Sequence, residues 1–415
     1  MKSLFQTGVQ ILVATIGMCG CSSYVGDQRP PDPKAGEPLT IVAIGDAGQS
    51  GGDLRGTAGY LTDMCTGRHD GGKFDVMVFL GDNFYNTGLN IPVSDVEGRI
   101  KSILGPYKTS FETLGRSNVH AIAGNHDYYA RNAIETSILF GLITISEGPV
   151  GFTDRGNKRE AEIQYWTYHY RMPANAFYAV APGARDSVQL IFFDSALLLR
   201  TDPHTWRPAL DSLQRLLVAA RDRPGILWRV FGTHHPFYTV GEHGGYTEWN
   251  DETHSVEYLT ACDKDSNAVG WIKNWLDPQD LCADKYKQYV DSVKSVIRVS
   301  GVKIQLVMSG HDHCLELLYY PEKDAGYAGW PKVHVISGAG SRTSRVKLPL
   351  PPHEFTSAQT RPEKEGMSVP GFAQLRFQGD KLRIVFFSSD NGDVIDMGGG
   401  KKEFVVDTTG ALISQ

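Results

Sequence analysis

The sequence predicts an α/β domain that begins near residue 39, and three observations lead to this prediction. Short apolar runs rich in β-branched residues recur along the chain, amphipathic segments of helical period lie between them, and an alternating pattern follows near the end. Near-continuous apolar strands are typical of sheets that are buried on both faces, as in sheets covered by helices.

Seven apolar runs are the expected strands of this domain. Their branched and aromatic side chains favour strands over helices. The runs span residues 39–46, 74–82, 118–127, 187–195, 226–236, 302–313 and 332–340.

Two segments between these runs are the expected helices, and one pattern near the end is an expected hairpin. Residues 208–223 and 284–301 have the spacing of amphipathic helices. The alternating stretch "FAQLRFQGDKLRIVFF" turns at Gly379-Asp380, which indicates a β-hairpin. The polar segment near 245–285 is expected to be an insert, so residues 39–415 are predicted to form one domain.

The N-terminus has the features of an export signal. Lys2 precedes an apolar segment, Val9–Met18, that is far shorter than the roughly 20 residues of a membrane-spanning helix. The ending "MCGCSS" resembles a bacterial lipoprotein processing site, in which Cys21 is the expected lipidation site. We therefore expect a lipoprotein signal peptide over 1–21, a flexible proline-rich tether over 22–38, and a periplasmic or outer-membrane-anchored bacterial lipoprotein. Plain secretion is the alternative.

The net charge bears on the kinds of partner that the protein binds, and the cysteine content bears on whether it forms disulfides. The net charge is -6 and no dense Lys/Arg run is present, which disfavours a nucleic-acid partner. Beyond the leader, four cysteines remain, an even number that permits disulfides in an exported protein. Cys262 and Cys282 both lie in the polar insert, and we expect these two to pair.

Polar side chains follow five of the expected strands. The strand-end sequences are Gly45-Asp46, Gly81-Asp82, "GNHD" from Gly124, "THHP" from Thr233 and "GHDH" from Gly310. In open α/β sheets the ligand site lies beyond the carboxyl ends of the strands, so these residues are expected to converge. Polar residues after a single strand ordinarily belong to a turn, but five such sequences in one chain indicate a ligand-binding site.

The chemistry of these side chains is that of metal binding. Carboxylate, amide oxygen and imidazole suit Fe, Mn or Zn, whereas a soft site would need clustered cysteines that this sequence lacks. The donors exceed the number that one tetrahedral ion needs, and a shared carboxylate can bridge two ions. Two ions roughly 3.5–4 Å apart can clamp both oxygens of an in-line displacement at phosphorus.

At these residues the sequence resembles a known family. The motifs "GDAG", "GDNFY", "GNHD", "THHPFYTVGEHG" and "GHDH", in this order, resemble the calcineurin-like metallophosphoesterases. More narrowly they resemble the purple acid phosphatases of the small, mammalian tartrate-resistant type. The resemblance implies the metallophosphoesterase fold, a four-layer αββα sandwich of two mixed β-sheets flanked by helices.

The resemblance also implies a dinuclear Fe(III)–M(II) centre, in which M is Fe, Zn or Mn. The ferric ion would be held by Asp46, Asp82, Tyr85 and His313, and the divalent ion by Asp82, Asn125, His234 and His311. Asp82 would bridge the two ions. Tyr85 would bind as a phenolate, and it distinguishes the purple phosphatases from relatives that lack this phenol.

The implied activity is acid phosphatase: hydrolysis of phosphate monoesters by a metal-activated hydroxide. His126 would bind the phosphoryl group, and His243 would protonate the leaving oxygen. The family commonly has another residue at the position of His235. We therefore expect His235 either to contact the metal ligands without binding a metal itself, or to lie exposed. The substrate would be a small phosphate ester or a phosphoprotein, and the protein would be a monomer.

Two other functions compete with this interpretation. The sequence places the metal ligands but not the walls of the pocket, so a phosphodiesterase or phospholipase of the same superfamily remains open. A metal-binding surface lipoprotein without catalysis is an alternative of a different class, although the intact ligand set with His126 and His243 argues against it.

Overall fold

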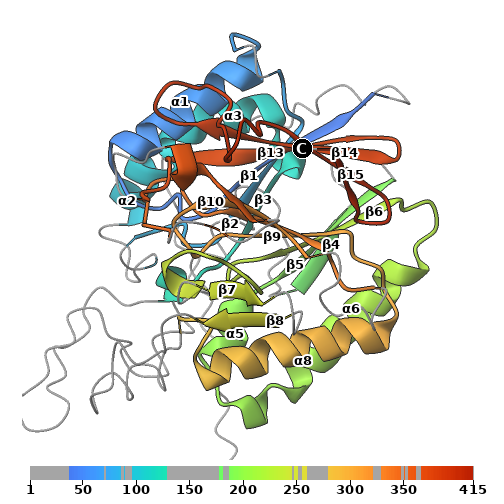
Figure 1. The fold of residues 1–415 in the computed structure, drawn as a ribbon. Coiled ribbons are helices and arrows are strands. Elements are labelled where there is room, and N and C mark those ends of the chain that lie inside the picture. Colours follow the sequence, from blue (N-terminus) through green and yellow to red (C-terminus); the bar gives the residue numbers. More distant parts are fainter. Residues whose placement is uncertain are drawn as a thin grey trace, which may run out of the picture.

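Two seven-stranded mixed β-sheets lie face to face, and helices cover the outer surface of each sheet (Figure 1). This arrangement confirms the α/β class and the four-layer αββα sandwich expected from the sequence. The computed structural model describes residues 37–69, 72–85, 88, 96–128, 177–180, 187–244, 247–250, 255–258, 279–320, 329–346, 350, 354–360 and 366–414.

The first sheet joins a parallel N-terminal part to an antiparallel C-terminal part. In spatial order its strands are β16 (Leu412–Ser414), β15 (Phe404–Asp407), β14 (Lys381–Ser388), β13 (Gly371–Gln378), β1 (Leu39–Ile44), β2 (Val76–Leu80) and β3 (Val119–Ile122). β1, β2 and β3 are parallel, and β1 pairs antiparallel with β13. The predicted hairpin is confirmed, because Gln378 pairs with Lys381 across the Gly379-Asp380 turn.

The second sheet has a parallel centre and antiparallel edges. In spatial order its strands are β12 (Glu354–Thr356), β10 (Leu315–Tyr319), β11 (Val333–Ser337), β9 (Leu306–Ser309), β6 (Trp228–Thr233), β5 (Val188–Phe193) and β4 (Phe177–Val180). Strands β5, β6, β9 and β11 run parallel. Their carboxyl ends therefore open on one side of the sheet.

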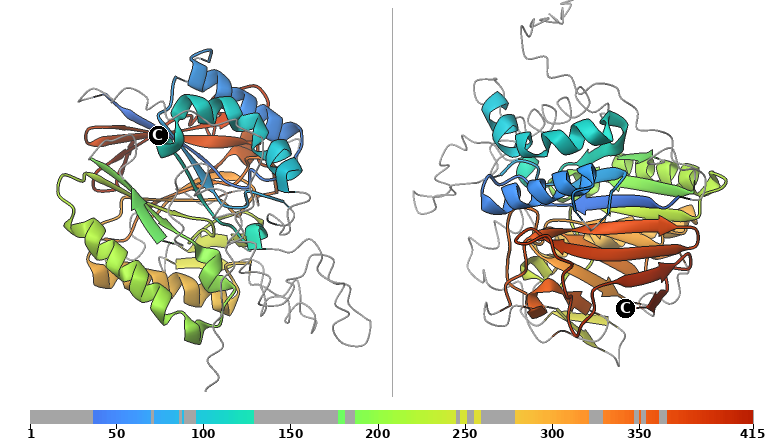
Figure 2. Two further views of the ribbon diagram at one scale, coloured as in Figure 1. Left: turned by 180° about the vertical axis from the view of Figure 1, so that it is seen from behind. Right: turned by 90° about the horizontal axis from the view of Figure 1, so that it is seen from above.

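Helices form the two outer layers (Figure 2). They are α1 (Gly52–Thr66), α2 (Val96–Ile103) and α3 (Lys108–Leu114) on the first sheet, and α5 (Ser195–Leu199), α6 (Arg207–Asp222) and α8 (Asp284–Ser300) on the second. Short 3₁₀ turns are η1 (Gly105–Tyr107), η2 (Arg116–Asn118), η3 (His126–Tyr128), η5 (Pro203–Thr205), η6 (Glu242–Gly244) and η8 (Ser357–Thr360).

The second sheet is apolar on both faces, because its strands pack against the other sheet on one side and against helices on the other. In β5, Leu190 and Phe192 belong to the core between the sheets, whereas Ile191 and Phe193 pack with the helices. Successive side chains of a strand point to opposite faces, so a strand covered on both sides is apolar throughout. This explains the near-continuous apolar runs in the sequence.

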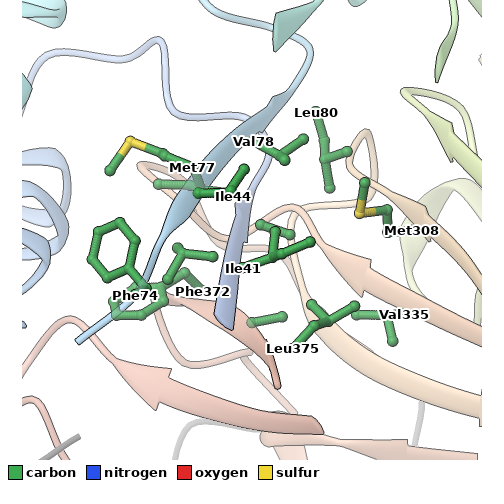
Figure 3. Packing of buried hydrophobic residues seen from close by; sticks show 14 of the residues in the cluster. Ile41, Ile44, Phe74, Met77, Val78, Leu80, Met308, Val335, Phe372 and Leu375 are labelled. Carbon is green, nitrogen blue, oxygen red and sulfur yellow. The ribbon is translucent and has the colours of Figure 1, made fainter. Parts of the chain in front are cut away.

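The core between the sheets is built from strands that lie far apart in the sequence (Figure 3). Ile41 of β1 is directly opposite Leu375 of β13, and both belong to one buried cluster with Val335 of β11. Figure 3 shows these three side chains side by side. Burial of a side chain of this size stabilises the fold by roughly 1.5–3 kcal/mol.

The seven expected runs all contain strands, and the two expected helices correspond to α6 and α8 within one residue at each end. The apolar runs and helical spacings described above did not predict β4, β10, β12, β15, β16 or the helices α1, α2, α3 and α5. In the region of the predicted insert, β7 (Thr247–Asn250) and β8 (Ser255–Tyr258) form a two-stranded antiparallel sheet.

Several sequence predictions fall on residues outside the described ranges. These are the signal peptide with Cys21, the tether up to residue 36, and Cys262, so the lipid anchor and the Cys262–Cys282 pairing stay predictions. Cys65 and Cys314, which are described, are buried free thiols. None of the described helices combines the length and the apolar character needed to cross a membrane.

Candidate metal centre

The seven expected metal ligands follow five strands drawn from both sheets. Asp46 follows β1, Asp82 and Tyr85 follow β2, Asn125 follows β3, His234 follows β6, and His311 and His313 follow β9. Six of these side chains are buried, and the side chain of His313 is 15% exposed. The expected convergence at the carboxyl ends of the parallel strands is therefore present.

Three of these residues have an unusual backbone conformation. Asp46, Asp82 and His311 have φ angles of 55°, 52° and 69°, and they are the non-glycine residues with positive φ in the described part of the chain. Such conformations cost roughly 1–3 kcal/mol each and concentrate at functional sites. The glycines before them permit close contact: a Cβ on Gly45 would lie 2.8 Å from the Cα of Gly310.

One half of the centre is assembled around the phenol of Tyr85. Its hydroxyl oxygen lies 2.6 Å from Asp46 Oδ1, 2.7 Å from Asp82 Oδ2 and 3.0 Å from His313 Nε2. One hydroxyl has a single proton to donate, yet two buried carboxylates approach it. Burial and these carboxylates raise the pKa of Tyr85 well above its usual value of 10.

The other half is assembled around the amide of Asn125. Asn125 Oδ1 lies 2.9 Å from His234 Nε2 and 3.1 Å from His311 Nδ1. The second carboxylate oxygen of Asp82, Oδ1, lies 3.4 Å from His234 Nε2. Asp82 therefore contacts both halves, one with each of its oxygens.

Backbone carbonyls orient the two imidazoles of this half. His234 Nδ1 lies 2.8 Å from the carbonyl oxygen of Leu80, and His311 Nε2 lies 2.8 Å from that of Gln279. A carbonyl only accepts, so each of these ring nitrogens donates and the other nitrogen of each ring faces the centre. In neutral His311, the Nδ1 lone pair then faces Asn125 Oδ1, and two facing acceptors fit a cation between them.

The charges of the centre are strongly coupled. Burial alone would raise the pKa of Asp82, but His234 and His126 hold it well below its usual value of 3.8. Burial alone would lower the pKa of His234, but Asp82 and Asp46 raise it to about 9. Burial and the neighbouring His243 and His235 lower the pKa of His311 well below 6.5. Buried charges of this kind are retained where they are paired or bind metal.

The residues present fit two metal ions. Among the described residues, two groups of side chains bring their ligand atoms within 4.8 Å of one another: Asp46, Asp82 and His234 in one, and His234, His235 and His311 in the other. The carboxylate of Asp46, the phenol of Tyr85 and the imidazole of His313 lie on one side of Asp82, and two imidazoles and an amide lie on the other. The arrangement is therefore able to hold a dinuclear centre.

Both expected catalytic histidines lie beside these ligands. The backbone N–H of His126 donates to Asp82 Oδ1 at 2.8 Å, and its ring lies 4.3 Å from the ring of Tyr85. The ring of His243 stacks on His311 at 4.2 Å, and its Nδ1 lies 2.9 Å from Asp280 Oδ1.

The environment of His243 favours its protonated form. Burial opposes the charge, but the hydrogen bond to Asp280 and the carboxylate of Asp312 raise the pKa of His243 to about 8. Asp280 lies in the predicted insert, and no sequence signal singled it out.

His235 is buried, so the expectation that it lies exposed is wrong. Its side chain is packed beneath the centre, with Nδ1 2.7 Å from the hydroxyl of Ser195 and its ring 4.4 Å from that of His311. Burial and the nearby His234 lower the pKa of His235 well below 6.5. The other expectation, that His235 contacts the metal ligands, agrees with these distances.

Asp127, the last residue of "GNHD", is a further buried residue that organises the centre. Its carboxylate accepts backbone N–H bonds from Asn83 at 2.9 Å, from Phe84 at 3.1 Å and from Gly124 at 2.7 Å. These bonds tie the turn after β2 to the turn after β3. Asp127 therefore fixes the spacing between Asp82 and Asn125.

This chain is similar to known proteins in both its sequence and its fold. The family model described as "Calcineurin-like phosphoesterase" matches residues 39–315. Among solved structures, GAP50, the anchor in the inner membrane complex of Plasmodium, is similar with a TM-score of 0.50 and 15% identity over 86% of this chain and 87% of that one. PhoD is similar with a TM-score of 0.51 and 12% identity over 93% of this chain and 73% of that one.

A search of curated proteins finds no match. At identities this low, the solved structures show a shared fold, whereas the family model matches most of the chain. Together with the convergent ligands, this match shows that the chain belongs to the calcineurin-like phosphoesterase family.

Proposed function

We propose that this protein hydrolyses phosphate monoesters at a dinuclear metal centre, as an acid phosphatase. The observation that carries the proposal is the position of Asp82. One oxygen lies 2.7 Å from the Tyr85 phenol and the other lies 3.4 Å from His234 Nε2. A carboxylate shared between an oxygen-rich half and an imidazole-rich half is what a two-ion phosphoesterase site requires.

The two halves differ in hardness, which supports two different ions. Asp46, Asp82, Tyr85 and His313 would hold Fe(III), and Asp82, Asn125, His234 and His311 would hold a divalent Fe, Zn or Mn. When bound, the ions would supply Lewis acidity, which acidifies a water molecule and neutralises charge on the phosphoryl group. A phenol beside two carboxylates is a hard, negatively charged donor set once its proton is lost.

The protein side chains would position the ester and move its protons. His126 is anchored to Asp82 through its backbone, so its ring is held beside Tyr85 where it would bind phosphoryl oxygen. Asp280 accepts from His243 Nδ1, which leaves Nε2 free to donate a proton to the leaving oxygen. The two histidines therefore have separate roles.

Turnover of two chromogenic esters tests this function against its rivals. We expect metal-loaded protein to hydrolyse p-nitrophenyl phosphate faster than bis(p-nitrophenyl) phosphate at acidic pH. Faster turnover of the diester would favour a phosphodiesterase. The fold itself is shared with GAP50, an anchor, so absence of turnover on both esters would favour a non-catalytic binding protein.

We also propose that the protein is an exported monomer, anchored to a bacterial membrane through lipid on Cys21. The apolar leader and the small residue Gly20 before Cys21 support this proposal. Labelled fatty acid should be incorporated into the wild type but not into Cys21→Ala. Equal labelling of both proteins, or none of either, would contradict the anchor.

A further inference from the structure

Arg342 is a cation beside the candidate metal centre, and it lies in none of the five motifs that carry the expected ligands. Its guanidinium carbon lies 4.7 Å from the centroid of the Tyr85 ring. The side chain is half-buried, and within the described residues it makes no hydrogen bond or ion pair. An arginine that is held close to a functional centre without an acceptor of its own suggests a ligand that supplies one.

The backbone around Arg342 is fixed to the predicted ligands. The hydroxyl of Ser341 donates to the carbonyl of Asp46 at 2.5 Å and accepts from the N–H of Gln49 at 2.9 Å. On the other side, the N–H of Ser344 donates to the carbonyl of His313 at 2.8 Å. Arg342 is therefore held between two anchors, and both attach to residues of the Tyr85 half of the centre.

The packing of Arg342 leaves its donors available. The contact of a guanidinium with an aromatic ring is electrostatic and uses none of its acceptor-seeking capacity for strong hydrogen bonds, so its five N–H groups can still bind oxygen acceptors. Arginine binds phosphate oxygens through two parallel N–H bonds, a geometry that lysine lacks. The position of Arg342 over the Tyr85 ring therefore places a guanidinium that is able to bind phosphate next to the centre.

We propose that Arg342 binds the non-esterified oxygens of the substrate phosphoryl group and so selects monoesters, which have three such oxygens, over diesters, which have two. This inference rests on the proposed function, in that the centre must bind phosphate esters. A diester has one fewer non-esterified oxygen than a monoester, and above the second pKa of the monoester, about 6, it also has one less negative charge. Arg342 thus contributes more to binding of the monoester, which makes it a specificity residue rather than a metal ligand.

Arg342→Gln removes the charge and the paired donors, while Arg342→Lys keeps the charge alone. The matched control is Arg215→Gln, which removes one arginine from an exposed position on α6 in the outer helix layer. For each metal-loaded protein, calorimetry gives the affinity for inorganic phosphate. Steady-state kinetics give KM and kcat for p-nitrophenyl phosphate and bis(p-nitrophenyl) phosphate.

We expect Arg342→Gln to raise the dissociation constant for inorganic phosphate about tenfold. A change of this size corresponds to the loss of one hydrogen bond to a charged group. KM for the monoester should rise more than kcat falls, and the ratio of diester to monoester kcat/KM should rise about tenfold. Arg342→Lys should recover part of the phosphate affinity but not the full monoester preference. Arg215→Gln should match the wild type.

Failure of this inference and failure of the proposed function give different results. Hydrolysis with unchanged phosphate affinity and ester preference in folded Arg342→Gln would overturn the role of Arg342 alone. Arg342-dependent phosphate binding without hydrolysis of either ester would overturn the proposed function and uphold the anion site. A wild type that binds no phosphate would overturn both.

Discussion

The Tyr85 phenol lies 2.7 Å from the carboxylate of Asp82, so two side chains that follow the single strand β2 meet at one point of the centre. The positive φ of Asp82 turns the chain immediately after the strand, and this brings Tyr85 back toward the carboxylate. A phenol placed between carboxylates is unfavourable as an anion unless a cation is bound. The strained turn at Asp82 therefore places these two side chains where a bound cation would stabilise them.

The substitution Tyr85→Phe removes the hydroxyl group of the side chain and keeps its aromatic ring. Because a phenolate bound to Fe(III) would give a visible charge-transfer band, we expect the wild type to have such a band and this variant to lack it, while the far-UV circular dichroism of the variant stays native. The half-buried Tyr60 on α1 provides a control, and Tyr60→Phe should keep the band. A band that persists in Tyr85→Phe would remove Tyr85 from the ligand set.

Asp82 contacts both halves and would be the ligand that the two ions share, so Asp82→Ala should abolish binding of both ions together. Activity should fall by more than the roughly 10–100-fold that substitution of supporting residues costs. Metal analysis checks the loss of both ions, and retention of one full equivalent would contradict a bridging role.

A comparison of Asp82→Gly with Asp82→Ala separates the effect of the Asp82 carboxylate from the effect of the strained backbone at this position. Both variants lack the carboxylate, but glycine adopts a φ of 52° without the cost that alanine has there. We expect metal-free Asp82→Gly to unfold with a free energy about 1 kcal/mol higher than that of Asp82→Ala. Urea titration of the two proteins measures this difference, and equal stability would argue against strain at Asp82.

His243→Gln should affect esters according to their leaving groups. Loss of a general acid costs roughly 10²–10⁴-fold, so kcat for an alkyl phosphate such as glycerol phosphate should fall by about 10²-fold. The loss should be much smaller for p-nitrophenyl phosphate, because its phenolate departs without a proton. Equal losses on both esters would show that His243 acts in binding instead of proton donation.

His120 on β3 makes the stability of the fold dependent on pH. Burial lowers the pKa of His120 to about 4 from the 6.5 expected in the unfolded chain. Between these pH values the unfolded state binds the additional proton, so the stabilising contribution is present above pH 6.5 and is lost as the pH falls toward 4. Full loss would amount to about 3 kcal/mol.

Urea unfolding at pH 6.5 and pH 4.5 checks this effect. His120→Asn should lose about 2 kcal/mol less stability over this interval than the wild type. The exposed His204 on η5 serves as the control, and His204→Asn should keep the wild-type pH dependence. An unchanged pH dependence in His120→Asn would contradict the assignment.

The convergence of the expected ligands could be predicted from the sequence because these residues obey a local rule. Each lies just after an apolar run, and parallel strands bring their carboxyl ends to one edge of a sheet. Asp46 and Asp82 therefore follow two neighbouring strands that pair with each other, β1 and β2. The same apolar runs predicted the parallel strands of both sheets.

Other parts depend on packing that no local pattern encodes. Strand β12 has three residues and β16 has three, too few for a period-two pattern to be read. Helix α1 contains Gly52, Gly56 and Gly59, which disfavour a helix on propensity although tertiary packing holds it. Burial of His235 and the position of Arg342 result from contacts between distant segments, namely with Ser195 and with Tyr85.

The most direct test of the central claim is the metal content of aerobically purified protein, read together with its visible spectrum. The proposed Fe(III)–M(II) centre around Asp82 predicts about two metal ions per chain, one of them iron, with a visible band that disappears in Tyr85→Phe. Well-folded protein that binds no metal and has no visible band would contradict the account.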